Sequence, residues 1–281
     1  MSKADKVFID LCNDIINNGT TNKNQKIRSH WDDGTPAYTM KKFGFVHKYD
    51  LREEFPALTL RKTAIISAMD EVLWIYQKKS NNINDLHSGI WDNWVDENNS
   101  IGKAYGYQVG KKCIVKDGIK MDQMDYVLEE LKNNPFSRRI LIDIWNPSEL
   151  HEMHLEPCCY NIIFNVTDEG KDKLVLNMTL NQRSNDVLVA NNWNLVQYSI
   201  LLMMVAQVSN MIPGVIMHCI TDVHIYDRHI NIIKELINRE TYPAPIVKLN
   251  PDIKNFYDFT TKDIIIENYK YGEQVKIPVS I

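Results

Sequence analysis

The stretch that decides the fold is NIIFNVTDEGKDKLVLNMTL, which spans residues 161–180. Its two ends, residues 161–167 and 174–180, are rich in branched and aromatic apolar side chains, which is typical of β-strands. Asp168-Glu169-Gly170 lies between them and supplies residues that favour a turn. We therefore predict an antiparallel β-hairpin.

The other elements follow outward from this hairpin. Apolar residues at helical spacing predict helices over residues 3–18, 62–78, 121–133, 195–208 and 228–238. Further strands are predicted over residues 140–145 and 218–226. Residues 38–60 and 246–281 are predicted to form short strands and turns, and residues 81–110 an aromatic-rich loop. Since no repeat or linker interrupts this series, we predict one α+β domain over residues 1–281.

The composition is that of an ordinary globular protein. Of the 281 residues 44% are hydrophobic and 24% are charged, which is enough for a full core without disulfides. The 32 basic against 36 acidic residues leave a net charge of −4. A protein that binds nucleic acid mainly through its phosphates is usually basic. The charge therefore disfavours such binding but allows a local anion site.

The cysteines and the apolar stretches indicate the compartment. Five cysteines without CxxC spacing predict neither a zinc site nor a disulfide framework, so no metal is expected. The N-terminus lacks the apolar core of a signal peptide, and the longest apolar stretch, near residues 200–208, is too short to cross a bilayer. We predict a soluble protein in the cytoplasm.

Cys158 is a candidate nucleophile because it follows Pro157 at the edge of a predicted strand. Free cysteines are often buried and inert, so this alternative stays open. Nearby cations favour a reactive thiolate, and Arg138, Arg139 and Arg183 all flank predicted strands. Forked guanidinium groups and the hydroxyl of Ser184 suit a phosphate monoester. The alternative for the arginines is a solvated strand end or a salt bridge.

Three more side chains are candidates for proton transfer or ligand binding. Glu71 lies within the apolar helix predicted over residues 62–78, where burial would raise its pKa and suit it to move a proton. The alternative is a carboxylate that faces solvent. His224 and Tyr226 alternate on a strand and therefore share a face, where they either bind a ligand or complete a core hydrogen-bond network.

In chain order, these residues and several further motifs resemble the folate-dependent thymidylate synthases, most of all the branch of some Gram-positive bacteria and their phages. The resemblance extends over nearly the whole chain. It is carried by Trp31-Asp32-Asp33-Gly34-Thr35-Pro36, Glu71-Val72-Leu73-Trp74, Ile90-Trp91-Asp92-Asn93-Trp94, Tyr105-Gly106, Ser137-Arg138-Arg139, Pro157-Cys158, Gln182-Arg183-Ser184-Asn185-Asp186, Asn194, His224-Ile225-Tyr226 and Pro278-Val279-Ser280-Ile281.

This resemblance implies the reductive methylation of dUMP to dTMP, with 5,10-methylenetetrahydrofolate as the donor of both the carbon and the hydride. It implies a homodimer that meets through one face of a central mixed sheet packed by long helices. Arg138 and Arg139 would then reach the partner's phosphate site. The implied catalytic residues are Cys158 as the nucleophile, Glu71, Tyr105, Asn194 and Arg183. The implied dUMP site comprises Arg28, Arg138, Arg139, Gln182, Arg183, Ser184, Asp186, Asn194, His224 and Tyr226.

The resemblance also implies a folate site with flat hydrophobic walls, closed by the C-terminal residues. Its residues would be Ile90, Trp91, Trp94, Leu155, Asp186, Ala190, Trp193 and Ile281. Within the family, an asparagine at the position of Asn194 suits uracil, because a carboxamide matches both O4 and N3–H.

Several positions depart from the family pattern. Ala190, Asn192 and Trp193 stand where Gly, Pro and Phe are usual, and Cys159, Ile163 and Thr221 replace His, Gln and Gly. These changes indicate either compensated repacking or a pocket that admits water. The second case would give a deoxyuridylate hydroxymethylase, which adds water in place of hydride, and this alternative stays open. A weakly catalytic relative that binds nucleotide or messenger RNA is disfavoured, because Cys158, Glu71 and the arginines are all retained.

Overall fold

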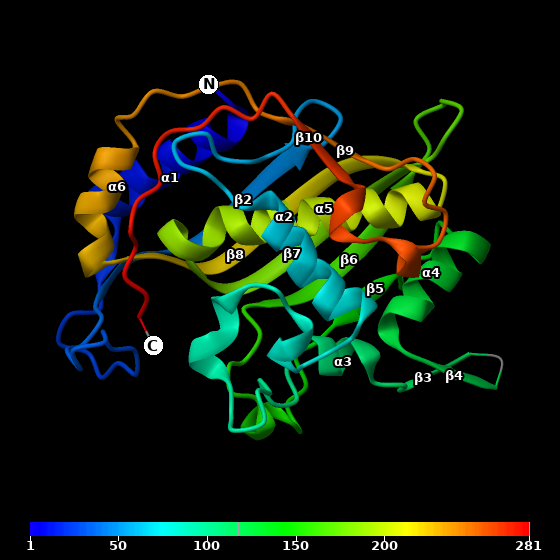
Figure 1. Ribbon diagram of the computed structural model, residues 1–281, viewed down its shortest axis with the longest axis horizontal. Helices are drawn as coiled ribbons and strands as arrows, with labels where there is room; N and C mark the ends of the chain where they lie inside the picture. The colour runs from blue at the N-terminus through cyan, green and yellow to red at the C-terminus, as the bar shows by residue number, and fades with distance from the viewer. Residues whose placement is uncertain (117, 281) are drawn as a thin grey trace.

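A mixed six-stranded sheet organises the chain (Figure 1). The computed structural model describes residues 1–116 and 118–280. The sheet has the order β1-β2-β8-β7-β6-β5, in which β7 and β8 run parallel and the other neighbours antiparallel. Its strands are β1 (Thr20–Thr21), β2 (Thr39–Asp50), β5 (Leu141–Asp143), β6 (Cys159–Thr167), β7 (Val175–Asp186) and β8 (Ile212–Tyr226). Two small two-stranded sheets pair β3 (Ile114–Lys116) with β4 (Ile119–Met121) and β9 (Ile246–Leu249) with β10 (Ile264–Glu267).

The predicted hairpin is confirmed as β6 and β7. Thr167 lies opposite Val175, and in the turn between them the Asp168 carboxylate accepts a hydrogen bond from Gly170 N–H at 2.9 Å. Gly170 adopts φ +70°, a conformation that glycine adopts without strain. Along β6, Ile162, Phe164 and Val166 are buried, and the residues between them are more exposed. This alternation places one face of the strand in the core.

Two helices cover one face of the sheet and build the main core. In Figure 1, α2 (Ile65–Val72) and α5 (Asn192–Val208) lie in front of β6, β7 and β8, and the two helices pack against each other. α5 is buried on nearly all sides, which explains its continuous apolar sequence. The other helices are α1 (Lys3–Asn18), α3 (Gly106–Gly110), α4 (Gln123–Asn133) and α6 (Ile230–Leu236). None of the helices within the described residues is long and apolar enough to span a membrane.

The prediction of short strands and turns over residues 38–60 is wrong for its first half, which is the single strand β2. Gly44 adopts φ +78° and leaves one gap in the ladder, but the register with β8 is the same on both sides. A residue typical of turns therefore lies within a continuous strand. The strand predicted over residues 218–226 begins earlier, at Ile212, for a similar reason. Pro213 and Gly214 lie inside β8, beside the irregular pairing between Leu176 and Met178.

The helix predicted over residues 62–78 begins later and changes type. Thr63 is held outside the helix, because its N–H donates to the Tyr269 hydroxyl at 2.8 Å and its hydroxyl donates to Asn192 Oδ1 at 2.6 Å. After α2 the chain continues as a π-helical turn, Leu73–Gln77. A second π turn, Val187–Asn191, precedes α5. Such wide turns are often found at functional sites.

The remaining predictions differ from the structure mainly in their bounds. The helix predicted over residues 228–238 is a 3₁₀ turn, Asp227–His229, followed by α6. Residues 81–110 contain the 3₁₀ turns Ile83–Asp85 and Gly89–Trp94 and end in α3. The tail has the two strands β9 and β10 with 3₁₀ turns between them.

The second face of the sheet carries apolar side chains that are not fully covered. Val46 is 62% exposed and Ile163 is 36% exposed. Val46 pairs with Cys219 and Ile163 with Thr179, so these residues share one face across the four central strands. Cys219 and Thr179 are half-buried. An apolar sheet face of this kind is typical of an interface between subunits.

Tyr105 and Gly106 pass unusually close to the chain at residues 79–80. Tyr105 has φ +42°, which is strained for an aromatic residue. A Cβ on Gly106 would lie 2.1 Å from the Ser80 carbonyl oxygen and 2.8 Å from the Ser80 nitrogen. Both are backbone atoms that cannot rotate away. Only glycine therefore fits at position 106, and this contact holds Tyr105 in place.

We predict that Gly106→Ala lowers the free energy of unfolding by about 3 kcal/mol, because backbone atoms must move to make room for the methyl group. Gly34→Ala is the matched control, since Gly34 has φ +78° but open space around its Cα. It should cost about 1 kcal/mol through backbone strain alone. Urea denaturation followed by circular dichroism measures both. Equal losses in the two variants would contradict the close contact at Gly106.

Candidate functional site

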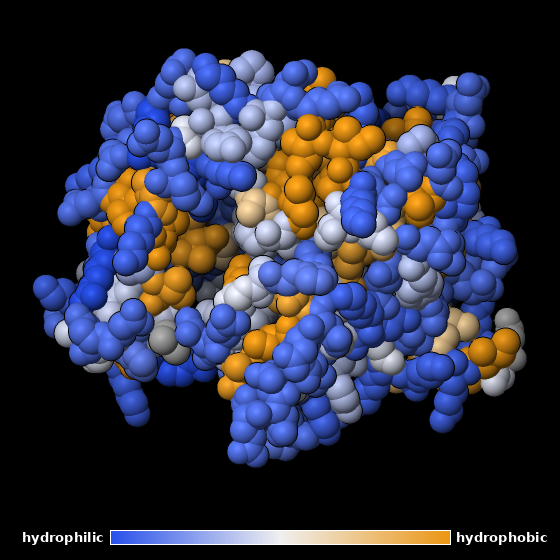
Figure 2. Space-filling view, in the orientation of Figure 1, coloured by the Kyte–Doolittle hydropathy of each residue, from blue (hydrophilic) through white to orange (hydrophobic). Residues whose placement is uncertain are grey.

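Two adjoining cavities meet at Cys158. One has a volume of about 240 Å³ and the other about 290 Å³. Figure 2 shows the surface hollowed over the beginning of α5, with hydrophobic side chains around the opening. The residues that line both cavities are Trp94, Leu155, Cys158, Val189, Ala190 and Val279. A molecule in each cavity would therefore have the Cys158 thiol beside it.

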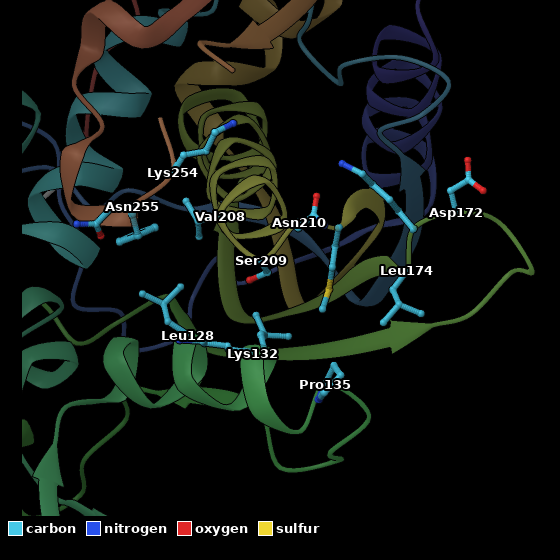
Figure 3. Close-up of a pocket in the computed structure, with 14 residues that line it drawn as sticks. Leu128, Lys132, Pro135, Asp172, Leu174, Val208, Ser209, Asn210, Lys254 and Asn255 are labelled. Carbon is cyan, nitrogen blue, oxygen red and sulfur yellow. The ribbon is translucent and has the colours of Figure 1, made fainter. Parts of the chain in front are cut away.

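A larger cavity of about 730 Å³ lies between α4, the end of α5 and residues 254–256 (Figure 3). Its charged side chains are Lys132, Asp172, Lys173 and Lys254, all of which are exposed. None of the predicted site residues lines it. Its size therefore does not mark it as the reactive site.

The structure places Cys158 directly before β6, where its environment controls the thiol. Its backbone N–H donates to the Tyr105 hydroxyl at 3.1 Å, which ties the cysteine to the strained residue described above. Burial raises the pKa of the Cys158 thiol above its ordinary value, and Arg183 and Arg28 act against this increase. The thiol is therefore mostly protonated at neutral pH, with two cations close enough to favour the thiolate.

Arg183 and Arg28 lie at the polar cavity together with Ser184. The Arg183 side chain is fixed by hydrogen bonds to the carbonyl oxygens of Pro157 and Glu156, at 3.0 and 2.7 Å. Arg28 is exposed and lies 3.9 Å from the Glu156 carboxylate. Two guanidinium groups and a hydroxyl thus line one end of the cavity, as expected for an anion site.

Arg138 and Arg139 do not join this group within one chain. Both are exposed and neither lines the two cavities. They lie just before β5, at the edge of the sheet. The family resemblance assigned four arginines to one phosphate site. A single chain brings only Arg28 and Arg183 together there.

Glu71 is buried in α2, with 4% of its surface exposed, so the alternative of a carboxylate that faces solvent is wrong. Its two oxygens have separate donors: Trp91 Nε1–H to Oε1 at 2.8 Å and Trp193 Nε1–H to Oε2 at 2.7 Å. Burial raises the pKa of Glu71, and the hydrogen bonds from Trp193, Trp91 and Gln197 act against this increase. A carboxyl with a raised pKa can both accept and return a proton near neutral pH.

A chain of amide hydrogen bonds links Glu71 to Asn194. Because a carboxylate only accepts, Gln197 presents its NH₂ group to Glu71 and its oxygen to Asn194, whose Nδ2 donates to it at 3.1 Å. Asn194 Oδ1 in turn accepts from Gln182 Nε2 at 3.0 Å, and Gln182 Oε1 accepts from His218 Nε2–H at 2.7 Å. Burial lowers the pKa of His218 to about 3, so this ring is neutral. Every amide in the chain therefore has a defined orientation.

His224 and Tyr226 both line the polar cavity, which agrees with the face predicted from their alternation. His224 Nδ1–H donates to Asp222 at 2.9 Å, so Nε2 is the ring nitrogen that remains for a ligand. Asp186 lines the same cavity, but one of its oxygens accepts from the N–H groups of Leu188 and Val189. Asp186 therefore fixes the start of the π turn before α5.

The second cavity has hydrophobic walls and contains most of the residues assigned to folate. They are Ile90, Trp91, Trp94, Leu155, Ala190 and Trp193. Asp186 lies in the polar cavity instead, and Ile281 lies outside the described residues. The C-terminal segment borders both cavities through Val279, and the Pro278 carbonyl is 2.8 Å from His229 Nε2.

Asn192 and Trp193, which depart from the family pattern, both form hydrogen bonds within the chain. Asn192 Oδ1 accepts from Leu58 N–H at 3.0 Å and its Nδ2 donates to the Pro56 carbonyl at 2.8 Å, while Trp193 bonds to Glu71. Both side chains are thus satisfied, which favours compensated repacking. Gln197, His218 and His229 were not predicted as site residues. Their signal was weak, because a single polar residue in an apolar segment does not show which side chain it meets.

No group of histidine, cysteine and acidic side chains suited to a metal occurs among residues 1–116 and 118–280.

Comparison with known proteins gives a consistent result. The family model described as thymidylate synthase matches residues 6–281. Thymidylate synthase 1 of Bacillus subtilis strain 168 is 42% identical, and thymidylate synthase of Bacillus phage phi3T is 41% identical, each over the full length of both chains. The solved structure of thermostable thymidylate synthase A from Bacillus subtilis has a TM-score of 0.93, with 42% identity and 99% of each chain covered.

We predict that alkylation of Cys158 by iodoacetamide accelerates as pH rises to 9 and beyond, because the thiolate is the reactive form and burial raises its pKa. Arg183→Ala removes a nearby cation and should slow the reaction at pH 8 by about tenfold, which corresponds to about one pKa unit. Arg183→Lys keeps the positive charge, so its alkylation rate should fall by less than that of Arg183→Ala.

Peptide mass spectrometry measures these rates, and the exposed Cys113 in the same chain serves as the internal reference. If the wild type and Arg183→Ala react at the same rate, Arg183 does not tune the thiol.

Proposed function

Because the chain belongs to the thymidylate synthase family, we propose that its two adjoining cavities bind dUMP and 5,10-methylenetetrahydrofolate and bring them together at Cys158. The activity is that of a thymidylate synthase, a methyltransferase that forms dTMP. The relatives carry this name, so the hydroxymethylase alternative is not favoured. The observation that supports a meeting of the two substrates at one thiol is the position of Cys158 in the wall of both cavities.

The polar cavity suits the phosphate and the deoxyribose of dUMP. Arg183, Arg28 and Ser184 provide donors for the phosphate, and Nε2 of His224 together with the Tyr226 hydroxyl can bond the deoxyribose hydroxyl. Asn194 lines the adjoining hydrophobic cavity, as Cys158 also does, and its Oδ1 and Nδ2 each have one bond within the amide chain. Oδ1 keeps one further lone pair, and Nδ2 keeps one further hydrogen. Oδ1 can therefore accept from N3–H of uracil, and Nδ2 can donate to O4.

The hydrophobic cavity suits a pterin. Trp91, Trp94 and Trp193 offer flat rings, and Leu155 and Ile90 complete the walls. The bound folate would supply the one-carbon unit and the hydride. Val279 borders both cavities, so a shift of the C-terminal segment toward the folate would exclude water from the reacting atoms.

The residues divide the work of the reaction. The Cys158 thiolate forms a bond to C6 of dUMP, and the electron pair of the C5–C6 bond moves to C5 and O4, which makes C5 a nucleophile for the one-carbon unit. Glu71 exchanges a proton with O4 through water, while the amide chain holds Asn194 in the orientation that binds the base. The Tyr105 hydroxyl, whose pKa is raised well above its ordinary value by burial, stays neutral beside Cys158, where it can help to remove the C5 proton. Cleavage of the S–C6 bond releases dTMP and restores the thiol.

The same proposal requires a homodimer. Arg138 and Arg139 are exposed in one chain, and the uncovered sheet face with Val46 and Ile163 provides a surface for a second copy. Across that interface the two arginines of one subunit would complete the phosphate site of its partner. We also propose that the enzyme works in the cytoplasm, where its nucleotide and folate substrates are available.

We predict that the wild-type enzyme converts dUMP and methylenetetrahydrofolate to dTMP and dihydrofolate. Mass spectrometry of the nucleotide, with the absorbance of dihydrofolate, measures both products. Cys158→Ala should lose at least about 10³-fold in turnover, since no other group forms the bond to C6, while dUMP still binds. Hydroxymethyl-dUMP together with tetrahydrofolate would contradict hydride transfer, and full activity in Cys158→Ala would exclude this nucleophile.

We predict that inactive Arg138→Ala and Cys158→Ala proteins recover activity when mixed under conditions that exchange subunits. Half of the dimers are then hybrids with one intact site each, so about a quarter of wild-type activity should return. A mixture of Cys158→Ala with the double variant Arg138→Ala/Cys158→Ala is the control and should stay inactive. If hybrids form, as shown by native mass spectrometry of differently tagged chains, and no activity returns, Arg138 does not act in the partner's site.

A further inference from the structure

The indole of Trp193 contacts the Glu71 carboxylate directly, and this contact is specific to the residue found here. We propose that Trp193 is a positioning residue, which holds the Glu71 carboxylate in the orientation it needs for the reaction. The proposal rests on the proposed function of Glu71 as acid and base. It goes beyond the predicted role of Trp193 as part of the folate wall.

The geometry of the contact leaves little freedom. Trp193 Nε1–H donates to Glu71 Oε2 at 2.7 Å, and Trp91 Nε1–H donates to Oε1 at 2.8 Å, so each oxygen has its own rigid donor. An indole N–H only donates, and a carboxylate only accepts. The two rings come from different segments, the Gly89–Trp94 turn and the first turn of α5. Together they fix the plane of the carboxylate.

Trp193 also connects the hydrophobic cavity proposed for folate with the hydrogen bonds that lead to Asn194. Its ring lines the hydrophobic cavity, while its N–H is directed to Glu71, which is linked to Asn194 through Gln197. The phenylalanine usual at this position in the resembled family has no such donor. A phenylalanine here would keep the apolar wall and remove only the hydrogen bond. The substitution therefore separates the two contributions of the residue.

The direction of the effect on the Glu71 proton follows from the charges around it. Burial raises the pKa of Glu71, and the bond from Trp193 acts against this increase, followed by those from Trp91 and Gln197. The other titratable groups that face it are Asp70, Tyr76, Tyr105 and Cys159. Asp70 is the acidic group among them, and its carboxylate is bonded to His87. Removing the Trp193 donor disfavours the carboxylate and should raise the pKa of Glu71.

The test is Trp193→Phe in the full-length enzyme labelled with ¹³C at the glutamate side-chain carboxyl. The Glu71 resonance is identified by its absence from Glu71→Gln. Its midpoint should rise by about one pH unit in Trp193→Phe, a tenfold change in proton affinity. The limb of the kcat–pH profile that reports Glu71 should move upward by the same amount, with KM for dUMP nearly unchanged. Trp94→Phe is the matched control, since Trp94 lines the same cavity without a described bond to Glu71. The Glu71 midpoint should not move in this variant.

An unchanged Glu71 midpoint in Trp193→Phe would overturn the proposal. A shifted midpoint with full turnover in Glu71→Gln would support the contact but refute the acid–base role of Glu71, so the two failures can be told apart. A second measurement uses the wild-type protein and therefore does not depend on whether Trp193→Phe folds. The ¹⁵N-labelled Trp193 indole proton should shift as Glu71 titrates, and the absence of any shift would also count against the proposal.

Discussion

The burial of the Glu71 carboxyl group is the constraint on which the arrangement of the site depends. A carboxylate removed from water is costly unless hydrogen bonds replace its solvation. Its three partners come from two other segments: Trp91 from a 3₁₀ turn, and Trp193 and Gln197 from α5. A single polar group therefore links helix α2, the 89–94 turn and α5, in addition to the packing between the two helices. The same group sets the direction of the amides that lead to Asn194.

Local sequence signals predicted the parts of the fold whose causes are local. The bounds of α1 match the prediction, because Ser2 caps the helix and Gly19 follows it. The β6–β7 hairpin was predicted from its turn residues. The continuity of β2 and the start of β8 were missed, because Gly44, Pro213 and Gly214 are turn-like residues that lie in strands through pairing with distant segments. The π turns at Leu73 and Val187 have no sequence signature of this kind.

The candidate site could be predicted only in part. Cys158 and Glu71 were suggested by their residue types and neighbours, and the resemblance to a known family supplied the roles of the others. Neither source showed that Trp193 bonds to Glu71 or that Asn192 joins α5 to residues 56–58, because these contacts join segments far apart in the chain. The position of Arg138 and Arg139 relative to a phosphate depends on a second subunit, which a single sequence does not place.

The parallel pairing of β7 and β8 limits how the length of this chain can vary. Asp186 lies beside His224 in this pairing, and both line the polar cavity. Gln182 and Ser184 of β7 and Tyr226 of β8 line the same cavity. Inserting or deleting one residue within either strand would turn its later side chains to the opposite face. We therefore expect insertions and deletions among homologues to be confined to segments such as residues 168–173, while the spacing within each of these strands stays constant.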